Sequence, residues 1–404
     1  MSVTERLYYR DSHLLEFEAR VISVTERVSG WAAVTLDRTA FYPTGGGQPS
    51  DTGMLGSARV VECIDEEEAG VLHVIQGQPL EVGAIVAGRV DWPRRLDHIQ
   101  QHTGQHILSQ AFVALFGAET RSFRMMEQVS EIDVALDAPT DEQIERVVDL
   151  ANSIVWEDRP VRARQVTKDE AAQLPLRRDS AREGELRIVE IEDFDLSPCG
   201  GTHAHRTGEV GLIAVRSWER AKGLARIEFI AGARALDDYR RANRTARSVA
   251  AKFSVGRDDA PASVARLVEE NKELARRVRA SEEVAARVEA VELLSEASRR
   301  GDAVKIVARV FDRRDADALK HLALALVAHP GTVALLGSRD GDSARLVFAR
   351  SADVRGDMNA LMREACAMLD GRGGGRADMA QGGARQTEGL AEAIEKAAQT
   401  LLVQ

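Results

Sequence analysis

The chain has 404 residues, with 54 lysines and arginines against 64 aspartates and glutamates, and its formal net charge at pH 7 is −10. A hydrophobic fraction of 44% and a charged fraction of 29% are typical of globular proteins and exclude wholesale disorder. The length predicts several domains, because single cores rarely exceed about 250–300 residues. The acidic total argues only weakly against nucleic acid as a partner, since binding needs a local basic face.

The cysteines and the apolar segments predict a cytoplasmic protein that does not enter a membrane. Three cysteines cannot form a disulfide framework, and the charged N-terminus lacks the apolar core of a secretory signal. The most apolar stretch, residues 322–336, contains the turn-forming tripeptide His329-Pro330-Gly331. It therefore predicts a helix, a turn and a strand rather than a membrane span.

Residues 1–92 are predicted to form a small β-barrel, because short β-type runs alternate there with glycine-rich turns. The runs and turns are residues 17–22, 82–90, 29–30, 45–47 and Gly53. Residues 93–235 are predicted to form an α+β sandwich, in which helices pack on one side of a sheet. The expected helices are 97–116 and 141–155, and the expected strands are 129–136, 186–191, 212–215 and 225–230.

From about residue 231 to residue 300 the pattern predicts one long polar helix, and residues 236–300 are assigned to a helical linker. An apolar seam with a 3–4 spacing runs along it, slips in phase near residues 281–284 and then resumes. The seam consists of Val264, Leu267, Asn271, Leu274, Val278, Val288, Val291 and either Leu294 or Ser295. It fits either a helix that folds back on its own chain or a dimeric coiled coil in which Asn271 fixes the register.

Residues 301–404 are predicted to form a C-terminal α/β domain. The expected strands are 304–311, 332–337 and 344–349, and the expected helices are 315–328, 357–369 and 388–403. Between the last two helices lies a glycine-rich segment, residues 371–383, which is expected to be a flexible loop.

Two separated motifs carry the ligands of a predicted zinc site. His98, His102 and His106 are spaced by four residues, so they point to one face of their helix. Cys199 and His203 flank two glycines in a later loop. Thiolate sulfur together with imidazole nitrogen selects zinc over magnesium or calcium. Spacing alone leaves His98 and His205 as spare histidines, and it does not distinguish a structural zinc from a catalytic one.

These motifs resemble the editing site of alanyl-tRNA synthetases and of the free-standing AlaX proteins. The resemblance rests on residues 102–106, on residues 199–203 and on the glycine-rich segment 41–53. Residues 378–383 resemble the DHH-associated domain at the C-terminus of the long AlaX form. The resemblance covers about residues 1–235 and 300–404.

The resemblance implies that the chain binds zinc and hydrolyses the ester of alanine tRNA mischarged with serine, with glycine as a further candidate. It implies four zinc ligands, which are His102, His106, Cys199 and His203. The first 90 residues are too few and too rich in strands for an ATP-binding module, which implies editing in trans. Polar candidates for reading the serine hydroxyl are Thr103, Gln105 and Ser122, although Ser122 is equally well read as a plain loop serine.

Further residues are candidates for contact with tRNA. The segment Gly45, Gly46, Gly47 and Gln48 is either a tight turn or a backbone approach to phosphate or ribose. Residues 216–252 carry ten lysines and arginines against four acids, a net +6, which is either a solvated helix face or an RNA contact. The individual candidates are Arg220, Lys222, Arg372 and Arg376.

Two rival functions remain, and so does a prediction about assembly. One rival is a zinc-stabilised tRNA-binding module without catalysis, and the other is a hydrolase of a small free substrate. The basic stretch and the C-terminal domain would have no purpose in a small-substrate hydrolase.

A homodimer through the helix at residues 260–295, or through the C-terminal domain, is the predicted assembly.

Overall fold

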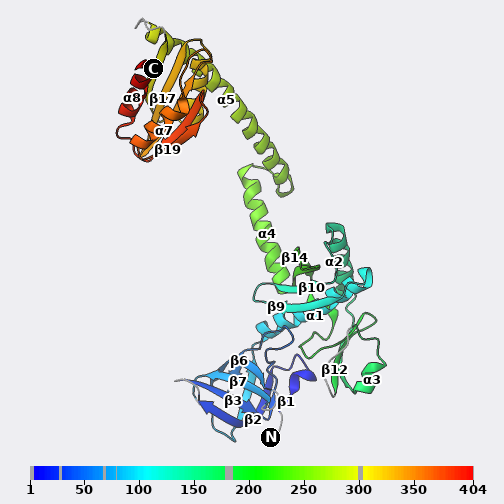
Figure 1. Cartoon of the computed structure of the whole chain (residues 1–404). Coiled ribbons are helices and arrows are strands. Elements are labelled where there is room, and N and C mark those ends of the chain that lie inside the picture. Colours follow the sequence, from blue (N-terminus) through cyan, green and yellow to red (C-terminus); the bar gives the residue numbers. More distant parts are fainter. Residues whose placement is uncertain are drawn as a thin grey trace. The chain divides into compact units, whose positions relative to one another are not determined.

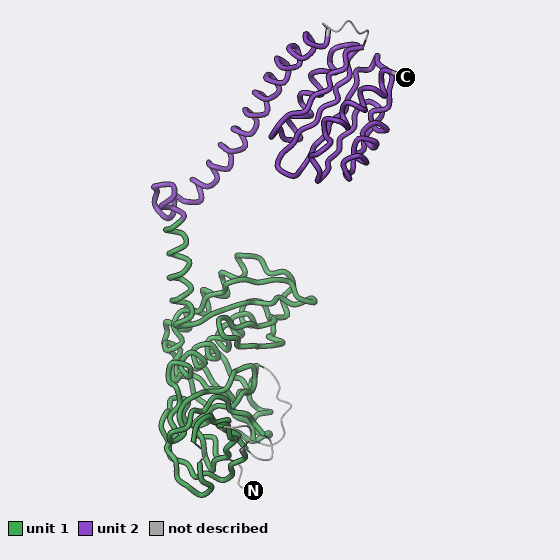
Figure 2. The backbone as a smooth tube through the Cα atoms, turned by 90° about the vertical axis from the view of Figure 1, so that its left-hand side faces the viewer, with its two compact units in different colours: residues 1–248 green, residues 249–404 purple. Residues whose placement is uncertain are grey.

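The computed structural model of the protein describes residues 4–26, 30–66, 70–78, 80–177, 185–298 and 304–403. The chain divides into two compact units, residues 1–248 and residues 249–404 (Figure 2). The expected α+β architecture, with an N-terminal barrel and a C-terminal sheet domain, is confirmed. Among the described residues, no helix is both long and apolar enough to cross a membrane. The domain boundaries expected near residues 92, 235 and 300 stay a prediction.

Six antiparallel strands close the N-terminal barrel in the order β2-β3-β7-β6-β5-β8 (Figure 1). The barrel closes because β2 pairs with β3 at one end and with β8 at the other. Val34, Phe41 and Ile75 are among the fully buried apolar side chains that fill it. The strands are β2 (Glu16–Glu26), β3 (Trp31–Leu36), β5 (Gly53–Leu55), β6 (Ala58–Glu66), β7 (Gly70–Gln76) and β8 (Ile85–Val90), and β1 (Glu5–Arg6) pairs with β4 (Arg38–Thr39) outside the barrel.

A four-stranded antiparallel sheet and two helices follow the barrel in the first unit. The strand order is β14-β15-β10-β9. Helix α1 (Trp92–Phe116) begins five residues earlier than expected, because Pro93 lies in its first turn, where a missing N–H costs nothing. The remaining elements are β9 (Thr120–Met125), β10 (Ser130–Val134), α2 (Asp141–Trp156), β14 (Ile213–Ala221) and β15 (Leu224–Ala231).

A second, smaller sheet of the first unit carries the loop with Cys199. Its strands are β11 (Val161–Val166), β12 (Leu186–Ile191) and β13 (Asp195–Pro198), with β12 in the centre. The short helix α3 (Lys168–Ala172) lies between β11 and β12 in the sequence, and η2 (Thr207–Val210) follows β13. Apolar side chains from this sheet, such as Val189 and Ile191, share one core with α1, α2 and the four-stranded sheet.

The single long helix expected between residues 231 and 300 is wrong, because two helices occupy this stretch. Helix α4 (Ala233–Lys252) ends before Ser254, whose φ of +55° is left-handed and cannot continue a helix. The short helix η3 (Arg257–Asp259) follows, and α5 (Ala260–Ser298) then begins with Pro261 in its first turn.

The second unit is a five-stranded sheet with helices on both faces. Alternate residues of the central strands β17 (Thr332–Asp340) and β18 (Ser343–Arg350) belong to two different apolar cores, as side-chain alternation in strands requires. One core contains side chains of α5 and α6, and the other contains side chains of α7 and α8. The strand order is β16-β17-β18-β20-β19, with only β16 and β17 parallel. The remaining elements are β16 (Lys305–Asp312), α6 (Ala316–Val327), α7 (Met358–Met368), β19 (Arg372–Gly375), β20 (Met379–Ala384) and α8 (Leu390–Val403).

One sequence-based expectation about the second unit is wrong. The glycine-rich segment is a hairpin of β19 and β20 rather than a flexible loop. A side chain at Gly373 would collide with Cys366 on α7, so the glycines allow the strand to lie close to that helix.

The resumed apolar seam of α5 packs within the unit only in part. Leu294 is buried and packs with α6 together with the smaller Ala286 and Ala290, whereas Val288 and Val291 are exposed.

Candidate metal centre

Four nitrogen and sulfur donors from two distant segments meet in the first unit. His102 and His106 come from consecutive turns of α1, and Cys199 and His203 come from the loop after β13. One ligand atom from each lies within 4.8 Å of the others. The expected set of four is therefore brought together, although His98 is not part of it. His98 is buried, and burial together with Arg94 lowers its pKa to about 3.

Each of the three imidazoles is oriented by a hydrogen bond at Nδ1. Gln48 Oε1 lies 2.7 Å from Nδ1 of His102, and Asp195 Oδ2 lies 2.9 Å from Nδ1 of His106. A third contact joins the hydroxyl of Thr103 to Nδ1 of His203 at 3.3 Å. Partners of this kind fix the tautomer and leave Nε2 with a lone pair for a metal.

The spacing of the donors fits a tetrahedral zinc ion. Zn–S and Zn–N bonds of about 2.3 and 2.05 Å place sulfur and nitrogen about 3.6 Å apart along a tetrahedral edge. The sulfur of Cys199 lies 3.4 Å from Nε2 of His102 and 3.2 Å from Nε2 of His203. The donor set and its spacing therefore suit zinc. Both observed sulfur–nitrogen distances are slightly shorter than the tetrahedral edge calculated for a bound zinc ion.

The surroundings favour the metal-binding protonation states of Cys199 and His203, whereas for His106 burial is outweighed by the hydrogen bonds and charges of Asp195 and Cys199, which raise its pKa. Burial alone would raise the pKa of Cys199, but the adjacent His102 and His203 outweigh it and lower that pKa well below its usual value. Burial lowers the pKa of His203 to about 3, so its ring is neutral at pH 7. The buried Asp195 has a pKa of about 2, because hydrogen bonds and charges from His106 and Arg177 outweigh its burial. Thiolate, neutral imidazole and an ionised orienting carboxylate are the forms that bind metal.

The loop between Cys199 and His203 is held by Arg187 and needs a glycine. Arg187 is nearly buried, and its Nη1 donates to the carbonyl oxygens of Cys199 at 2.8 Å and of Gly201 at 2.9 Å. A side chain on Gly201 would collide with the imidazole of His102. The close approach of the loop to α1 therefore explains why the motif needs glycine at Gly201.

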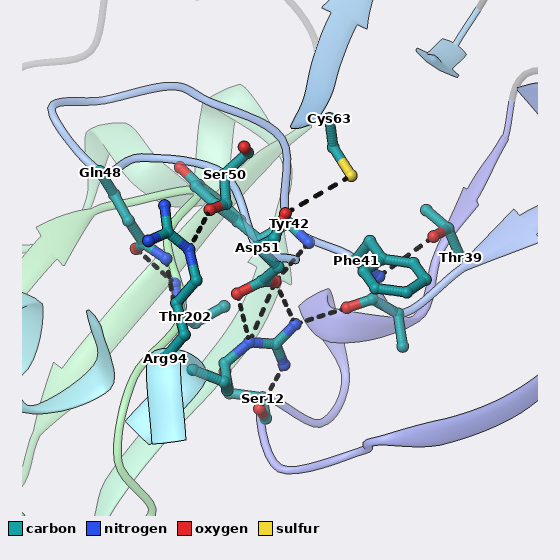
Figure 3. Close-up of polar contacts among 12 residues, drawn as sticks. Ser12, Thr39, Phe41, Tyr42, Gln48, Ser50, Asp51, Cys63, Arg94 and Thr202 are labelled. Carbon is teal, nitrogen blue, oxygen red and sulfur yellow. Dashed lines mark hydrogen bonds and ion pairs between the residues drawn. The ribbon is translucent and has the colours of Figure 1, made fainter. Parts of the chain in front are cut away.

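The glycine-rich segment is fixed by a buried ion pair at its end, shown in Figure 3. Asp51 is fully buried, and its Oδ2 lies 2.5 Å from Nη2 of Arg95 on α1. The same guanidinium donates to the carbonyl oxygens of Ser12 and Ala40, each at 2.6 Å. The other carboxylate contact of Asp51 is the backbone N–H of Tyr42, at 2.7 Å. This network joins the N-terminal segment, the glycine-rich segment and α1.

A cleft of about 600 Å³ opens over three of the four donors, and His203 lies behind them. His102, His106 and Cys199 lie in its wall. Of the predicted polar pocket residues, Gln105 and Ser122 line the cleft, whereas Thr103 is fully buried beside His203. Other lining residues are Arg6, Tyr9, Tyr42, Gly45, Gly46, Arg121, Arg177 and Arg187.

The predicted substrate-binding glycines form a turn at the edge of this cleft. Gly45 and Gln48 exchange two backbone hydrogen bonds, at 3.0 and 2.9 Å, so the segment is a tight turn. Gly45 and Gly46 line the cleft, and Gly47 adopts a φ of +84°. Gln48 is 1% exposed and lies behind His102, where its amide also donates to Thr202 at 2.9 Å.

The candidate basic residues lie on exposed surfaces. Arg220 and Lys222 are exposed on the hairpin of β14 and β15, and Arg372 and Arg376 are exposed at β19. In the stretch 216–252, six of the ten basic side chains are ion-paired, and their partners include Asp137, Asp133 and Asp97 from outside the stretch. The surface charge is consequently smaller than the local count of +6 suggests.

Sequence reasoning missed the residues that support the donors. Asp195 precedes Cys199 by four residues in an acidic stretch, and nothing in that stretch distinguishes it from its neighbours. Only the pairing of β12 with β13 directs it at His106. Arg187 is likewise one arginine among many, and its role depends on the fold of the loop.

Family models match three parts of the chain. The model described as "Threonyl and Alanyl tRNA synthetase second additional domain" matches residues 186–228, which include Cys199 and His203. The model "DHHA1 domain" matches residues 303–402. A third model, "tRNA synthetases class II (A)", matches residues 4–94, which include the barrel and the glycine-rich segment 41–53.

Relatives of two kinds align with nearly the whole chain, and one solved structure matches a quarter of it. The alanine–tRNA ligase of Pyrobaculum neutrophilum is 34% identical over 98% of this chain, but the chain spans only 44% of that relative. A solved structure, the C-Ala domain of Aquifex aeolicus alanyl-tRNA synthetase, is 29% identical; the match covers 25% of this chain and 93% of that one, with a TM-score of 0.24. The alanyl-tRNA editing protein AlaX-L of Pyrococcus horikoshii is 32% identical, and the alignment covers 94% of both chains. The chain therefore belongs to the family of AlaX alanyl-tRNA editing proteins, in its long form.

Proposed function

We propose that this chain is a zinc-dependent deacylase that releases serine from mischarged alanine tRNA, with glycine as a further candidate that the assay below tests. The observation that carries the proposal is the Cys-His₃ donor cluster in the wall of a cleft large enough for an aminoacyl adenosine. The chain aligns with 94% of AlaX-L and with 44% of the alanine–tRNA ligase of Pyrobaculum neutrophilum. The likeness to AlaX-L supports the further proposal that editing acts in trans, on tRNA charged by a separate synthetase.

His102, His106, Cys199 and His203 would hold the zinc ion. When bound there, zinc would supply Lewis acidity toward the ester carbonyl or the attacking water. The chain's own groups position the substrate. Gly45 and Gly46 border the cleft without side chains, so a ribose or phosphate can approach their backbone.

Gln105 is the residue we propose to recognise the serine hydroxyl. It lines the cleft from α1 and is 6% exposed, and its Nε2 donates to Ser109 Oγ at 2.7 Å. That contact fixes the amide, while Oε1 has no partner among the described residues. A fixed acceptor can bind a hydroxyl and reject alanine, which has none. Ser122 is the second candidate, although its hydroxyl already donates to Asp133 at 2.7 Å.

The test is hydrolysis of Ser-, Gly- and Ala-tRNA(Ala) by the purified full chain. We expect rapid release of serine and little release of alanine. Gln105→Ala should lower kcat/KM for Ser-tRNA(Ala) about 10–100-fold, as the loss of one buried hydrogen bond predicts. Gln110→Ala, on the same helix but outside the cleft lining, is the matched control. A protein that binds this tRNA and leaves the ester intact would be a tRNA-binding module, and the proposal would be wrong.

The body of the tRNA would contact exposed basic residues in each unit. Arg372 and Arg376 have no ion-pair partner among the described residues, whereas Arg220 is paired with Asp137. Lys222, at the tip of its hairpin, likewise has no ion-pair partner among the described residues. Replacing Arg372 and Arg376 by alanine should weaken tRNA binding and reduce its salt dependence, because phosphate contacts release counterions.

The first half of α5 supports a homodimer as the assembly. Val264, Leu267, Leu274 and Val278 are 40–54% exposed and follow the heptad spacing around Asn271. One face of the second half of the same helix packs with α6, whereas the heptad positions of the first half have no apolar core cluster against them among the described residues. Light scattering across a concentration series should give the mass of two chains, and Leu274→Glu should give one. A single-chain mass for the unmodified protein would exclude this dimer.

A further inference from the structure

A second cluster of metal-binding side chains lies in the first unit, outside the Cys-His₃ cluster. It consists of Asp11 and His13, from the segment before β2, and His205, which follows the second metal-binding motif by two residues. One ligand atom from each lies within 4.8 Å of the others. Neither the proposed deacylation nor the matched family descriptions assign a role to it.

One ring nitrogen of His13 is buried and has no hydrogen-bond partner among the described residues. Nε2 of His13 lies 2.8 Å from the carboxylate of Glu209. Because an ionised carboxylate only accepts hydrogen bonds, Nε2 carries the proton and Nδ1 keeps a lone pair. This Nδ1 is the buried nitrogen that lacks a hydrogen-bond partner in the described part of the chain. A buried acceptor without a donor is costly, and a cation at this position would satisfy it.

The other two side chains of the cluster lie close to His13 and to each other. Nε2 of His205 lies 3.2 Å from Oδ1 of Asp11, and the rings of His13 and His205 lie 3.9 Å apart between centroids. The backbone N–H of His13 donates to the same Asp11 oxygen at 2.8 Å, which fixes the carboxylate. An ion pair between Asp11 and His205 explains their own contact, but it does not satisfy Nδ1 of His13.

We propose that Asp11, His13 and His205 form a second site for a divalent transition metal such as zinc or cobalt. Two imidazoles and one carboxylate are ligands typical of these ions, and three protein ligands leave positions for water. Glu209 orients His13 from the far side of its ring, as carboxylates do behind metal-binding histidines. Asp11 and His205 have half-exposed side chains, so an ion can enter from solvent.

The site joins the N-terminal segment to the loop that carries His203. Ser12 lies between two of its ligands, and its Oγ accepts a hydrogen bond from the backbone N–H of His203 at 3.1 Å. An ion bound by Asp11, His13 and His205 would therefore fix the segment that supports this ligand of the Cys-His₃ cluster. The role we assign to the second ion is structural.

The test is a titration of the metal-free full chain with Co²⁺, followed by absorption spectroscopy and metal analysis. Co²⁺ in the Cys-His₃ cluster produces a thiolate charge-transfer band, and Co²⁺ in the second site cannot, because it has no sulfur ligand. We expect about two ions per chain, of which only the first adds the thiolate band. Asp11→Asn and His205→Ala should each bind about one ion and retain that band.

His329→Ala, which removes an exposed histidine of the second unit, is the matched control and should still bind both ions. One ion per chain in the unmodified protein would overturn the proposal. It would also be overturned if Asp11→Asn or His205→Ala kept the second ion, or if either lost the thiolate band. Metal binding is measured without tRNA, so the outcome does not depend on whether the chain deacylates tRNA.

Discussion

Replacing Asp195 by asparagine tests whether the zinc affinity depends on the groups behind the ligands. The carboxylate is fully buried and contacts Nδ1 of His106 at 2.9 Å and Nε of Arg177 at 2.7 Å. Asparagine preserves the shape, but its single carbonyl oxygen can serve only one of these donors. Loss of such an orienting partner typically costs 10–100-fold in metal affinity. That range corresponds to about 1.4–2.8 kcal/mol of binding free energy.

The assay is competition for zinc between the protein and a chromophoric chelator, with deacylation measured on the same samples. Asp193→Asn is the matched control, because it makes the same chemical change at an exposed position two residues away. We expect weaker zinc binding and slower deacylation for Asp195→Asn, and no change for Asp193→Asn. Unchanged zinc affinity in a folded Asp195→Asn protein would refute the orienting role of this carboxylate.

Three further predictions concern the barrel and the loop. Asp51→Asn leaves the buried Arg95 without its charge partner and should lower the free energy of unfolding by about 3–5 kcal/mol in urea titrations, whereas the exposed Asp137→Asn should change it little. Burial lowers the pKa of His73 to about 4, below its unfolded value, so its contribution of about 3 kcal/mol is present above pH 6.5 and is lost as the pH falls toward 4. Thermal unfolding should therefore depend less on pH over this range in His73→Gln, and an identical dependence would contradict the assignment. Gly201→Ala should reduce both zinc content and deacylation, because the new methyl group collides with a zinc ligand; full zinc content would show that the loop can move aside.

Local patterns in the sequence predict the chemistry of the donors, and the family resemblance selects the four that the structure brings together. Histidines four residues apart share a helix face, and a Cys-Gly-Gly-Thr-His segment brings its own two ligands together. Gln48 and Asp195 illustrate what local patterns miss. Each orients a histidine that is distant in the sequence, and only the packing of the barrel and β13 on α1 creates those contacts.

The errors in the fold prediction have physical causes of the same kind. The prediction of one helix gave too little weight to Gly256 and Pro261, which are poor helix formers, and Ser254 with its left-handed φ lies between the two long helices. Glycines at residues 373–375 predict flexibility in isolation, but in the sheet they allow β19 to approach α7. Val288 and Val291 look like core residues by size, although α6 accepts the smaller Ala286 and Ala290.

Removal and restoration of zinc test the central claim most directly. The full chain is stripped of metal, hydrolysis of Ser-tRNA(Ala) is measured, and zinc is then added back at about one equivalent per chain. We predict that deacylation is lost with the metal and returns with the first equivalent, in parallel with zinc bound to the Cys-His₃ cluster. Undiminished serine release by folded, metal-free protein would contradict the account, and so would a zinc-loaded protein that leaves the ester intact.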